Sequence, residues 1–550
     1  MMNRLGRIAQ TVEFTVAGLI TAGILALHLN VMQHAGPLWR DEISSLRVAT
    51  MPTFGGLWST LVYDPVPALF FSVVRVWNWV CSGASDDNLR QLGFVVGLGI
   101  TVALWVTAWS LKKAPPSWAL LLFGLSPVAL VWGDSMRAYG IGCLFNILAV
   151  GCIWKVICAR PRAAHVIAAA IAALLGVQCL FPNSLLLFAA ISAATVVALR
   201  ERWWRTALIL PAIGMTAALS LLPYAGVIHA TQSWSALCKV GASFRWIFTM
   251  LFHALQSGGQ LAASLWIAGA AIAAITLLLA MVRPRLLGMD AEERNLAIYA
   301  GITLLLASGM TICFFTLVGW ATSLWYYLPV MATGVVCIDS AAKILRKSAI
   351  ATIVNSLLVL FAAMALSPLA LQATSVRLTN VDLTTAAVAQ RAQPEDLVVV
   401  DNYFYGISFH RYYHGKAPWV SVPDVNDFTL HRWDLLTDSM RRPHPIQTVL
   451  DRIDQTLKAG HDVYVVGFAL TNRGAVPPTD LPAAPAHGSD WTLWPYVRRW
   501  TMQIAYTVQT HGAHGKVVPV HCGQSISVAE DVHAIVVNGW KDTQVAAAAP

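Results

Sequence analysis

Long stretches without a charged residue recur through the first 376 residues of this 550-residue chain. A helix needs about 20 mostly apolar residues to cross the hydrocarbon core of a bilayer, which is roughly 30 Å thick. Two stretches are long enough for two helices each, with breaks at 181–183 and near 320–325, so the pattern predicts about eleven spans. The stretches are 14–39, 91–111, 114–133, 138–154, 163–199, 206–238, 246–282, 295–338 and 348–376.

The composition supports a polytopic α-helical membrane protein. Hydrophobic residues make up 57% of the chain and charged residues only 12%, whereas an ordinary soluble protein has roughly 25% charged residues. A fully soluble protein is excluded because so few ionic groups cannot cover a folded surface in water. The nine cysteines are scattered along the chain, which also excludes a small disulfide-stabilised scaffold.

Basic residues indicate the orientation of the spans. Lys and Arg collect in cytoplasmic loops, and with eleven spans and a cytoplasmic N-terminus every basic cluster, up to 343–347, falls inside. If the apolar stretch 65–83 also spanned the membrane, every later basic cluster would fall on the outer side. We therefore interpret it as a helix in the outer interface, with Arg75 snorkelling to the polar layer. The odd number of spans places residues 373–550 outside.

Two domains are predicted, a transmembrane domain (1–372) and an extracytoplasmic α/β domain (373–550). In the second domain, buried strands are expected at 397–401 and 463–468, and helices at 385–391 and 446–459. This domain has no Asn-x-Ser/Thr acceptor, which favours a bacterial inner membrane as the location. Cytoplasmic loops account for the basic residues, so no nucleic acid partner is expected.

Carboxylates gather in the first outer loop, where Asp41 and Glu42 follow the first span and Tyr63 and Asp64 come further on. Asp41 can accept the proton of an incoming hydroxyl group while the hydroxyl oxygen attacks a carbon atom. The alternative is that both acids cap the helix expected at 43–50, where the helix dipole favours negative charge.

The second outer loop contains Asp134, Arg137 and Tyr139. An Arg on the outer side departs from the positive-inside tendency. A phosphate oxyanion would explain it, because guanidinium pairs with phosphate in a bidentate fork. The alternatives are an ion pair with Asp134 or contact with lipid headgroups.

Four short motifs resemble the GT-C glycosyltransferases, and among them the protein O-mannosyltransferase and lipid A aminoarabinose transferase group. The motifs are Trp39-x-Asp41-Glu42, Asp64-Pro-x-Pro67, Ser126-Pro127 and Arg137-x-Tyr139. The layout is similar as well, with about 11–13 spans, interfacial helices in the first outer loop and a C-terminal outer domain. The resemblance covers mainly 10–160 in motifs and 1–372 in layout.

The resemblance implies transfer of a single sugar from a polyprenyl-phosphate carrier to an extracytoplasmic lipid, glycan or protein, with inversion. Asp41 matches the catalytic carboxylate and Glu42 its neighbour, while Asp134 matches the acid of the second loop. Arg137 is the first candidate for the donor phosphate and Arg75 the second. Candidates for binding the donor or acceptor sugar are Asp134, Tyr139, Asp64 and Tyr63.

Two departures from the family pattern limit the resemblance. The segment 323–327 lacks the Arg that many relatives have before a Tyr in a later outer loop. Asp64 also stands where the aminoarabinose transferases have a Lys, which makes an aminoarabinose substrate less favoured. Binding of phosphate by the later loops stays open.

No cofactor is predicted to be obligatory. The sequence has no Asp-x-Asp and no phosphate-binding Gly loop, which argues against a nucleotide-sugar donor held through a metal. Carboxylates in the loops leave a divalent metal as an alternative. His410 and His414 share helical spacing, but no third zinc ligand is evident.

Two other classes of function compete with a glycosyltransferase. A transporter or flippase of lipid-linked glycans would need polar residues along a central path, and the spans offer few of them, such as His28, Asn146, Gln178 and Asn183. A scaffold or binding protein would have no need of eleven spans and ranks last.

Overall fold

The computed structural model describes residues 2–81, 83, 85–158, 162–235, 243–467, 478–484 and 492–541. They form two compact units. The helical unit comprises 2–34, 66–226 and 243–375, and the α/β unit comprises 35–65, 227–235 and the described residues from 376 onward.

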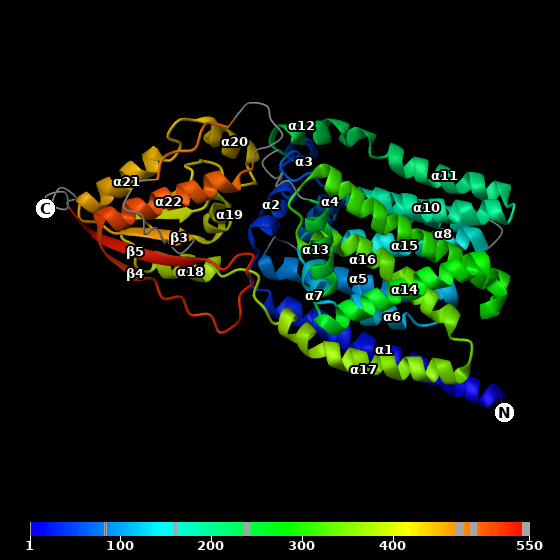
Figure 1. Ribbon diagram of the computed structural model, residues 1–550. Helices are drawn as coiled ribbons and strands as arrows, with labels where there is room; N and C mark the ends of the chain where they lie inside the picture. The colour runs from blue at the N-terminus through cyan, green and yellow to red at the C-terminus, as the bar shows by residue number, and fades with distance from the viewer. Residues whose placement is uncertain are drawn as a thin grey trace. The chain divides into compact units, whose positions relative to one another are not determined.

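Within the described residues, nine helical segments are long and apolar enough to cross a membrane, and they belong to the bundle of long helices in Figure 1. Their main helices are α1 (Met2–His34), α5 (Asp86–Lys112), α8 (Ala138–Cys158), α10 (Asn183–Arg200), α11 (Trp204–Leu219), α14 (Gln260–Val282), α15 (Ala291–Val318), α16 (Leu328–Leu345) and α17 (Ala349–Thr374). The two breaks predicted inside the long apolar stretches are confirmed by the gaps between α9 and α10 and between α15 and α16.

Two further predicted spans are shorter or interrupted. The helix α9 (Ala163–Cys179) has 17 residues. The stretch 114–133 is divided into α6 (Ser117–Ala119), a π-helical turn η1 (Leu120–Gly124) and α7 (Pro127–Gly133). Pro127 has no N–H to continue the hydrogen-bond ladder, so a new helix begins there. The described residues therefore contain nine segments that are long and apolar enough to span, two fewer than the eleven predicted, because the helix at 163–179 is short and the stretch 114–133 is interrupted.

The remaining helices of this unit are short. They are α4 (Ala68–Val80) and α13 (Phe244–Leu255), with 3₁₀ turns at η2 (Leu222–Tyr224), η4 (Pro284–Leu287) and η5 (Leu324–Tyr327). The helix α12 (Ala225–Ser235) begins in this unit, but its residues 227–235 belong to the α/β unit. At 13 residues and 1.5 Å per residue, α4 reaches only about 20 Å. It is therefore too short to span a bilayer core, in agreement with the prediction that 65–83 forms a helix that does not cross the membrane.

Buried ion pairs bring several basic residues to one end of the helical unit. Lys112 at the end of α5 pairs with Asp339 of α16, with Nζ 2.6 Å from Oδ2. Arg346, just after α16, pairs with Glu13 in the first half of α1. All four side chains are 5% exposed or less, and a buried charge is tolerated only when it is paired. Basic residues that the sequence assigns to one membrane side thus lie at one end of the bundle.

A five-stranded mixed sheet with the strand order β2-β1-β3-β5-β4 forms the centre of the α/β unit. The strands are β1 (Leu397–Asp401), β2 (Trp419–Ser421), β3 (Val463–Gly467), β4 (Gly512–Val517) and β5 (His533–Trp540). β2, β1 and β3 run parallel, whereas β5 is antiparallel to both β3 and β4. Every residue of β1 and β3 is buried, as expected for parallel strands covered on both faces.

Helices cover both faces of this sheet, with α21 and α22 on one face and α18 on the other (Figure 1). The helices of the unit are α18 (Val381–Ala389), α19 (Tyr403–Tyr412), α20 (Trp433–Arg441), α21 (Gln447–Lys458) and α22 (Trp494–His511). The predicted fold class, a helical membrane protein with a small C-terminal α/β domain, is confirmed.

The loop after α1, residues 35–65, folds as part of the α/β unit. Its helices are α2 (Arg40–Ala49) and α3 (Phe54–Thr60), and α2 packs against α19. Indole N–H groups of Trp234 and Trp433 donate to the carbonyls of Val62 and Tyr63, at 3.0 and 3.3 Å. Sequence alone predicted one boundary at 372/373. The structure puts it at 375/376 and adds 35–65 and 227–235 to the second unit.

Candidate functional site

Glu42 closes the N-terminus of α2. Its Oε2 accepts a hydrogen bond from the backbone N–H of Trp39 at 3.2 Å, which is the return contact of a capping box. The side chain is fully buried. The capping role that the sequence left open is therefore present for Glu42, and a catalytic role for it stays a prediction.

Asp41 is the more accessible of the two adjacent acids, with 23% of its side chain exposed. Its Oδ1 lies 3.2 Å from Nε2 of His431 and 3.6 Å from Nε of Arg40. The His431 ring is buried and stacks on Trp433, with ring centroids 5.3 Å apart. The α/β unit thus surrounds this carboxylate with a fixed imidazole and a guanidinium.

Arg40 also approaches a second, fully buried acid, Glu530. The guanidinium Nη1 lies 3.8 Å from Oε1 of Glu530 and donates to the carbonyl of Ala529 at 2.9 Å. Ser408 Oγ donates to the same carboxyl at 2.9 Å. Burial raises the pKa of Glu530 to about 7, although the charge of Arg40 opposes the shift. This carboxyl therefore titrates near neutral pH.

Tyr63 and Asp64 take part in contacts within the α/β unit. Asp64 is buried, and its Oδ2 accepts a hydrogen bond from Ser45 Oγ of α2 at 2.9 Å. The Tyr63 hydroxyl donates to Asp434 at 3.4 Å, and the Arg432 guanidinium lies over its ring at 5.2 Å. Both residues fix the loop in place, and sugar binding by them stays a prediction.

In the helical unit, the carboxylate of Asp134 is turned toward α1. Its Oδ2 lies 2.7 Å from His28 Nδ1, and both residues are buried. A Cβ at Gly97 of α5 would lie 2.4 Å from both partners, so only glycine leaves room for this pair. The predicted contact of Asp134 with a sugar stays a prediction.

Arg137 is among the residues that line a narrow cleft between α4, α5 and α8. The cleft is lined by Arg137 and Ser135 and by seven apolar or small residues, namely Phe70, Val73, Leu92, Gly93, Val96, Met136 and Ile141. A guanidinium beside apolar walls fits an amphiphile with an anionic head. Arg75 of α4 is not among the lining residues.

Tyr139, at the start of α8, packs against the later segment η5. Its ring centroid is 5.9 Å from that of Tyr326, and Trp132 and Trp325 lie 4.2 Å apart. The later loop therefore meets the second loop through aromatic rings. This is the segment in which the sequence lacks the Arg of many relatives.

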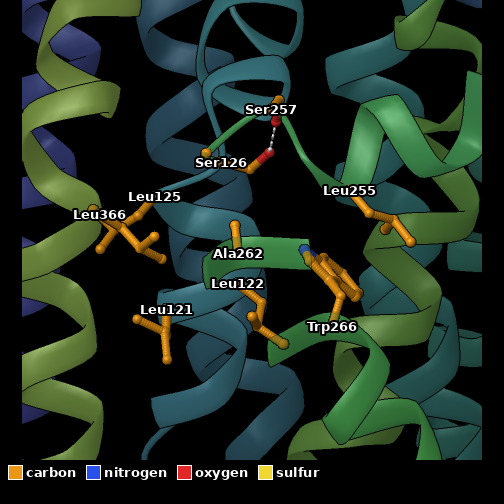
Figure 2. Close-up of a pocket in the computed structure, with 10 residues that line it drawn as sticks. Leu121, Leu122, Leu125, Ser126, Leu255, Ser257, Ala262, Trp266 and Leu366 are labelled. Atoms are coloured by element: carbon orange, nitrogen blue, oxygen red, sulfur yellow. Dashed lines mark hydrogen bonds between the residues drawn. The ribbon is translucent and has the colours of Figure 1, made fainter. Parts of the chain in front are cut away.

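A second, small pocket lies where η1 meets the start of α14 and the second half of α17 (Figure 2). Two of the lining residues, Ser126 and Ser257, are joined by a hydrogen bond between their Oγ atoms at 3.3 Å. The other lining residues are apolar or glycine: Leu121, Leu122, Leu125, Leu255, Gly258, Ala262, Trp266 and Leu366. Without a charged lining residue, this pocket suits a phosphate group less well than the Arg137 cleft.

The predicted site residues fall into two groups. Asp41, Glu42, Tyr63 and Asp64 belong to the α/β unit, whereas Arg75, Asp134, Arg137 and Tyr139 belong to the helical unit. A meeting of Asp41 with Arg137 stays a prediction. Among the residues that the structure describes, no group of three His, Cys, Asp or Glu is placed to hold a metal ion.

Sequence reasoning missed His431 and Glu530 near the first loop. They lie 390 and 490 residues beyond Asp41 and Arg40 respectively, in contacts that only the fold creates. The local sequence gives no signal for either, because a single His or Glu in a soluble-type segment is ordinary.

Comparisons with known proteins find distant structural likeness. No protein-family model matches the sequence, and no curated protein matches it. ArnT from Cupriavidus metallidurans bound to undecaprenyl phosphate is similar over 82% of this chain and 92% of its own, with 14% identity and a TM-score of 0.48. The Archaeoglobus fulgidus oligosaccharyltransferase tethered to an acceptor peptide is similar over 82% of this chain and 68% of its own, with 10% identity and a TM-score of 0.46.

At these identities and TM-scores, the likeness does not assign an activity or a substrate to this chain.

Proposed function

We propose that this protein is an inverting glycosyltransferase that moves one sugar from a polyprenyl-phosphate carrier to an extracytoplasmic acceptor. The observation that carries the proposal is the setting of Asp41. Its carboxylate is partly exposed, in the first turn of α2 and seven residues after the end of α1, with His431 and Arg40 at Oδ1. A carboxylate so held can serve as a general base.

The reaction needs one displacement. The acceptor oxygen attacks the anomeric carbon while its proton passes to Asp41, and the bond from that carbon to the phosphate oxygen breaks. The electron pair leaves with the polyprenyl phosphate. A guanidinium beside that phosphate stabilises the charge that develops on it, and Arg137 is the group assigned here to this role.

The cleft at Arg137 supports the choice of donor. A polyprenyl phosphate is dissolved in the membrane, so its head needs a cation next to apolar helix surfaces. The cleft combines a guanidinium with the apolar side chains of α4, α5 and α8. This pairing suits a lipid-linked sugar better than a nucleotide sugar, which has no hydrocarbon tail.

The proposed orientation places the N-terminus in the cytoplasm of a bacterial cell and the α/β unit outside its inner membrane. Lys112 and Arg346 lie at the same end of the helical unit through their pairs with Asp339 and Glu13. By the positive-inside rule this end faces the cytoplasm. Labelling of single cysteines introduced at either end in intact cells would test the orientation.

The catalytic role is tested with Asp41→Asn and a radiolabelled polyprenyl-phosphate sugar. Loss of the base is expected to lower turnover by on the order of 10²- to 10⁴-fold. Asp438→Asn is the matched control, because Asp438 is 53% exposed in the same unit. Near-normal turnover of Asp41→Asn would remove the proposed mechanism, and mass spectrometry of copurified lipid would identify the donor independently.

A further inference from the structure

The segment between β2 and α20 delivers one imidazole to the carboxylate of the first loop. His431 Nε2 lies 3.2 Å from Asp41 Oδ1, and the two residues are 390 positions apart in the chain. Both belong to the α/β unit. The contact therefore joins the C-terminal part of the chain to the residue proposed as the general base.

The backbone around His431 is fixed from both sides. The buried Tyr403 hydroxyl accepts from the N–H of Arg432 at 2.7 Å and donates to the carbonyl of Leu430 at 3.1 Å. The N–H of His431 itself donates to Ser44 Oγ of α2 at 3.4 Å. This arrangement leaves the imidazole little freedom to move away from Asp41.

The ring is held by stacking as well. The planes of His431 and Trp433 differ by 19°, and Trp433 stacks in turn on Trp234, with centroids 5.5 Å apart and planes 16° apart. Trp234 is buried in the core of the α/β unit. Three rings in series thus fix the direction in which Nε2 points.

The geometry also indicates which nitrogen holds the proton. Nε2 faces a carboxylate oxygen, so it is the N–H donor. Nδ1 is buried and has no hydrogen-bond partner among the described residues. A lone pair at Nδ1 is tolerated there better than a second N–H, which would be buried without an acceptor.

We propose that His431 is a positioning residue for Asp41: its Nε2–H holds Oδ1 and so fixes the orientation of the carboxylate toward the acceptor hydroxyl. This inference rests on the proposed function and gives the C-terminal part of the chain a share in the reaction. His431 itself touches no substrate in this scheme and takes up no proton. It acts by keeping the base in a productive direction, which a freely rotating Asp side chain would not hold.

Two substitutions at this position separate the hydrogen bond from packing. His431→Phe keeps a flat ring against Trp433 and removes the donor. His431→Gln gives up the ring, but its amide nitrogen can take the place of Nε2. The inference expects His431→Phe to lower kcat by on the order of 10- to 100-fold with little change in KM for the lipid donor. His431→Gln is expected to stay within about threefold of the wild type, because a donor to Oδ1 is retained.

The chain offers a matched control in the same unit. His511 Nδ1 lies 2.5 Å from Asp454 Oδ1, and its ring packs against Trp540 with centroids 4.7 Å apart. His511→Phe therefore removes the same type of His–Asp contact beside a Trp, away from α2. Its turnover is expected to equal that of the wild type, and thermal unfolding of all variants checks that they are folded.

The outcomes distinguish this inference from the proposed function. Loss of turnover in Asp41→Asn with full turnover in His431→Phe overturns the role of His431 and leaves the function standing. Equal losses in His431→Phe and His431→Gln also overturn it, because the donor to Oδ1 that glutamine retains would then make no difference to turnover. Full turnover in Asp41→Asn removes the catalytic assignment itself, and the inference falls with it.

Discussion

His28 and Asp134 form a buried pair inside the helical unit, with Nδ1 of the imidazole 2.7 Å from Oδ2 of the carboxylate. His28 belongs to α1, and Asp134 follows the last residue of α7. A buried carboxylate is costly unless a partner satisfies it. The pair therefore ties the second loop, which also contains Arg137, to the first span.

Gly97→Ala tests the importance of this pair. The added Cβ would lie 2.4 Å from both Asp134 Oδ1 and His28 Nδ1, so at least one partner must move. A loss of about 1–3 kcal/mol in the free energy of unfolding is expected, as for other overpacked buried sites. A lower midpoint of thermal unfolding in detergent, together with lower turnover, would show it.

The control for Gly97→Ala is Gly18→Ala on α1, where an added Cβ meets nothing within 4 Å. Alanine favours a helix over glycine by about 1 kcal/mol, so the control should be neutral or slightly more stable. Equal midpoints for the two variants would contradict the close approach at Gly97.

The pH dependence of stability is expected to depend on Glu530. Burial raises its pKa in the folded protein to about 7, from 4.5 in the unfolded chain. Between these values the folded state keeps a proton that the unfolded state has released, so stability falls as the pH rises. The loss through this window is on the order of 3 kcal/mol and is complete above about pH 7.

Glu530→Gln mimics the protonated carboxyl and can still accept the hydrogen bond from Ser408. The variant should match the wild type near pH 5 and be more stable at pH 8, which flattens the dependence of the unfolding midpoint on pH. Asp401 is also fully buried, with its pKa raised to about 7 by burial, so part of the slope will persist. An unchanged slope in Glu530→Gln would contradict the assignment.

Glu42 is expected to serve stability more than turnover. Glutamine can fill the same position of a capping box, because its carbonyl also accepts from the N–H of Trp39. Glu42→Gln should therefore keep turnover within about threefold of the wild type, whereas Glu42→Ala should lose about 1–2 kcal/mol of stability. If Glu42→Gln unfolds normally but has lost its turnover, Glu42 has a catalytic role.

The spans and the strands β1 and β3 could be predicted from the sequence, because long apolar runs are local properties of the chain. The difference between Asp41 and Glu42 could not. Adjacent residues on a helix point about 100° apart, so one acid faces the core and the other stays partly exposed. Which is which depends on the direction from which α19 and the segment around His431 pack on α2.

The sequence also could not predict that the first loop belongs to the α/β unit. It depends on single hydrogen bonds between distant segments, such as the one from Trp234 to Val62. A buried Trp and an interfacial Trp have the same local sequence signature. Likewise, the carboxylate of Asp134 has a buried partner in His28, 106 residues earlier in the chain, and nothing in the loop sequence indicates it.

Arg137 is expected to determine the use of the lipid donor. Arg137→Ala removes the guanidinium that lines the apolar cleft, so kcat/KM for the polyprenyl-phosphate sugar should fall by on the order of 10²- to 10³-fold. The kcat/KM of Arg137→Lys should lie between those of the wild type and Arg137→Ala, because an ammonium group keeps the charge but loses the bidentate fork. Arg75→Ala is the control, since Arg75 is on α4 but does not line the cleft. A larger loss in Arg75→Ala than in Arg137→Ala would move the phosphate to the other face of α4, and the cleft would then have no part in donor binding.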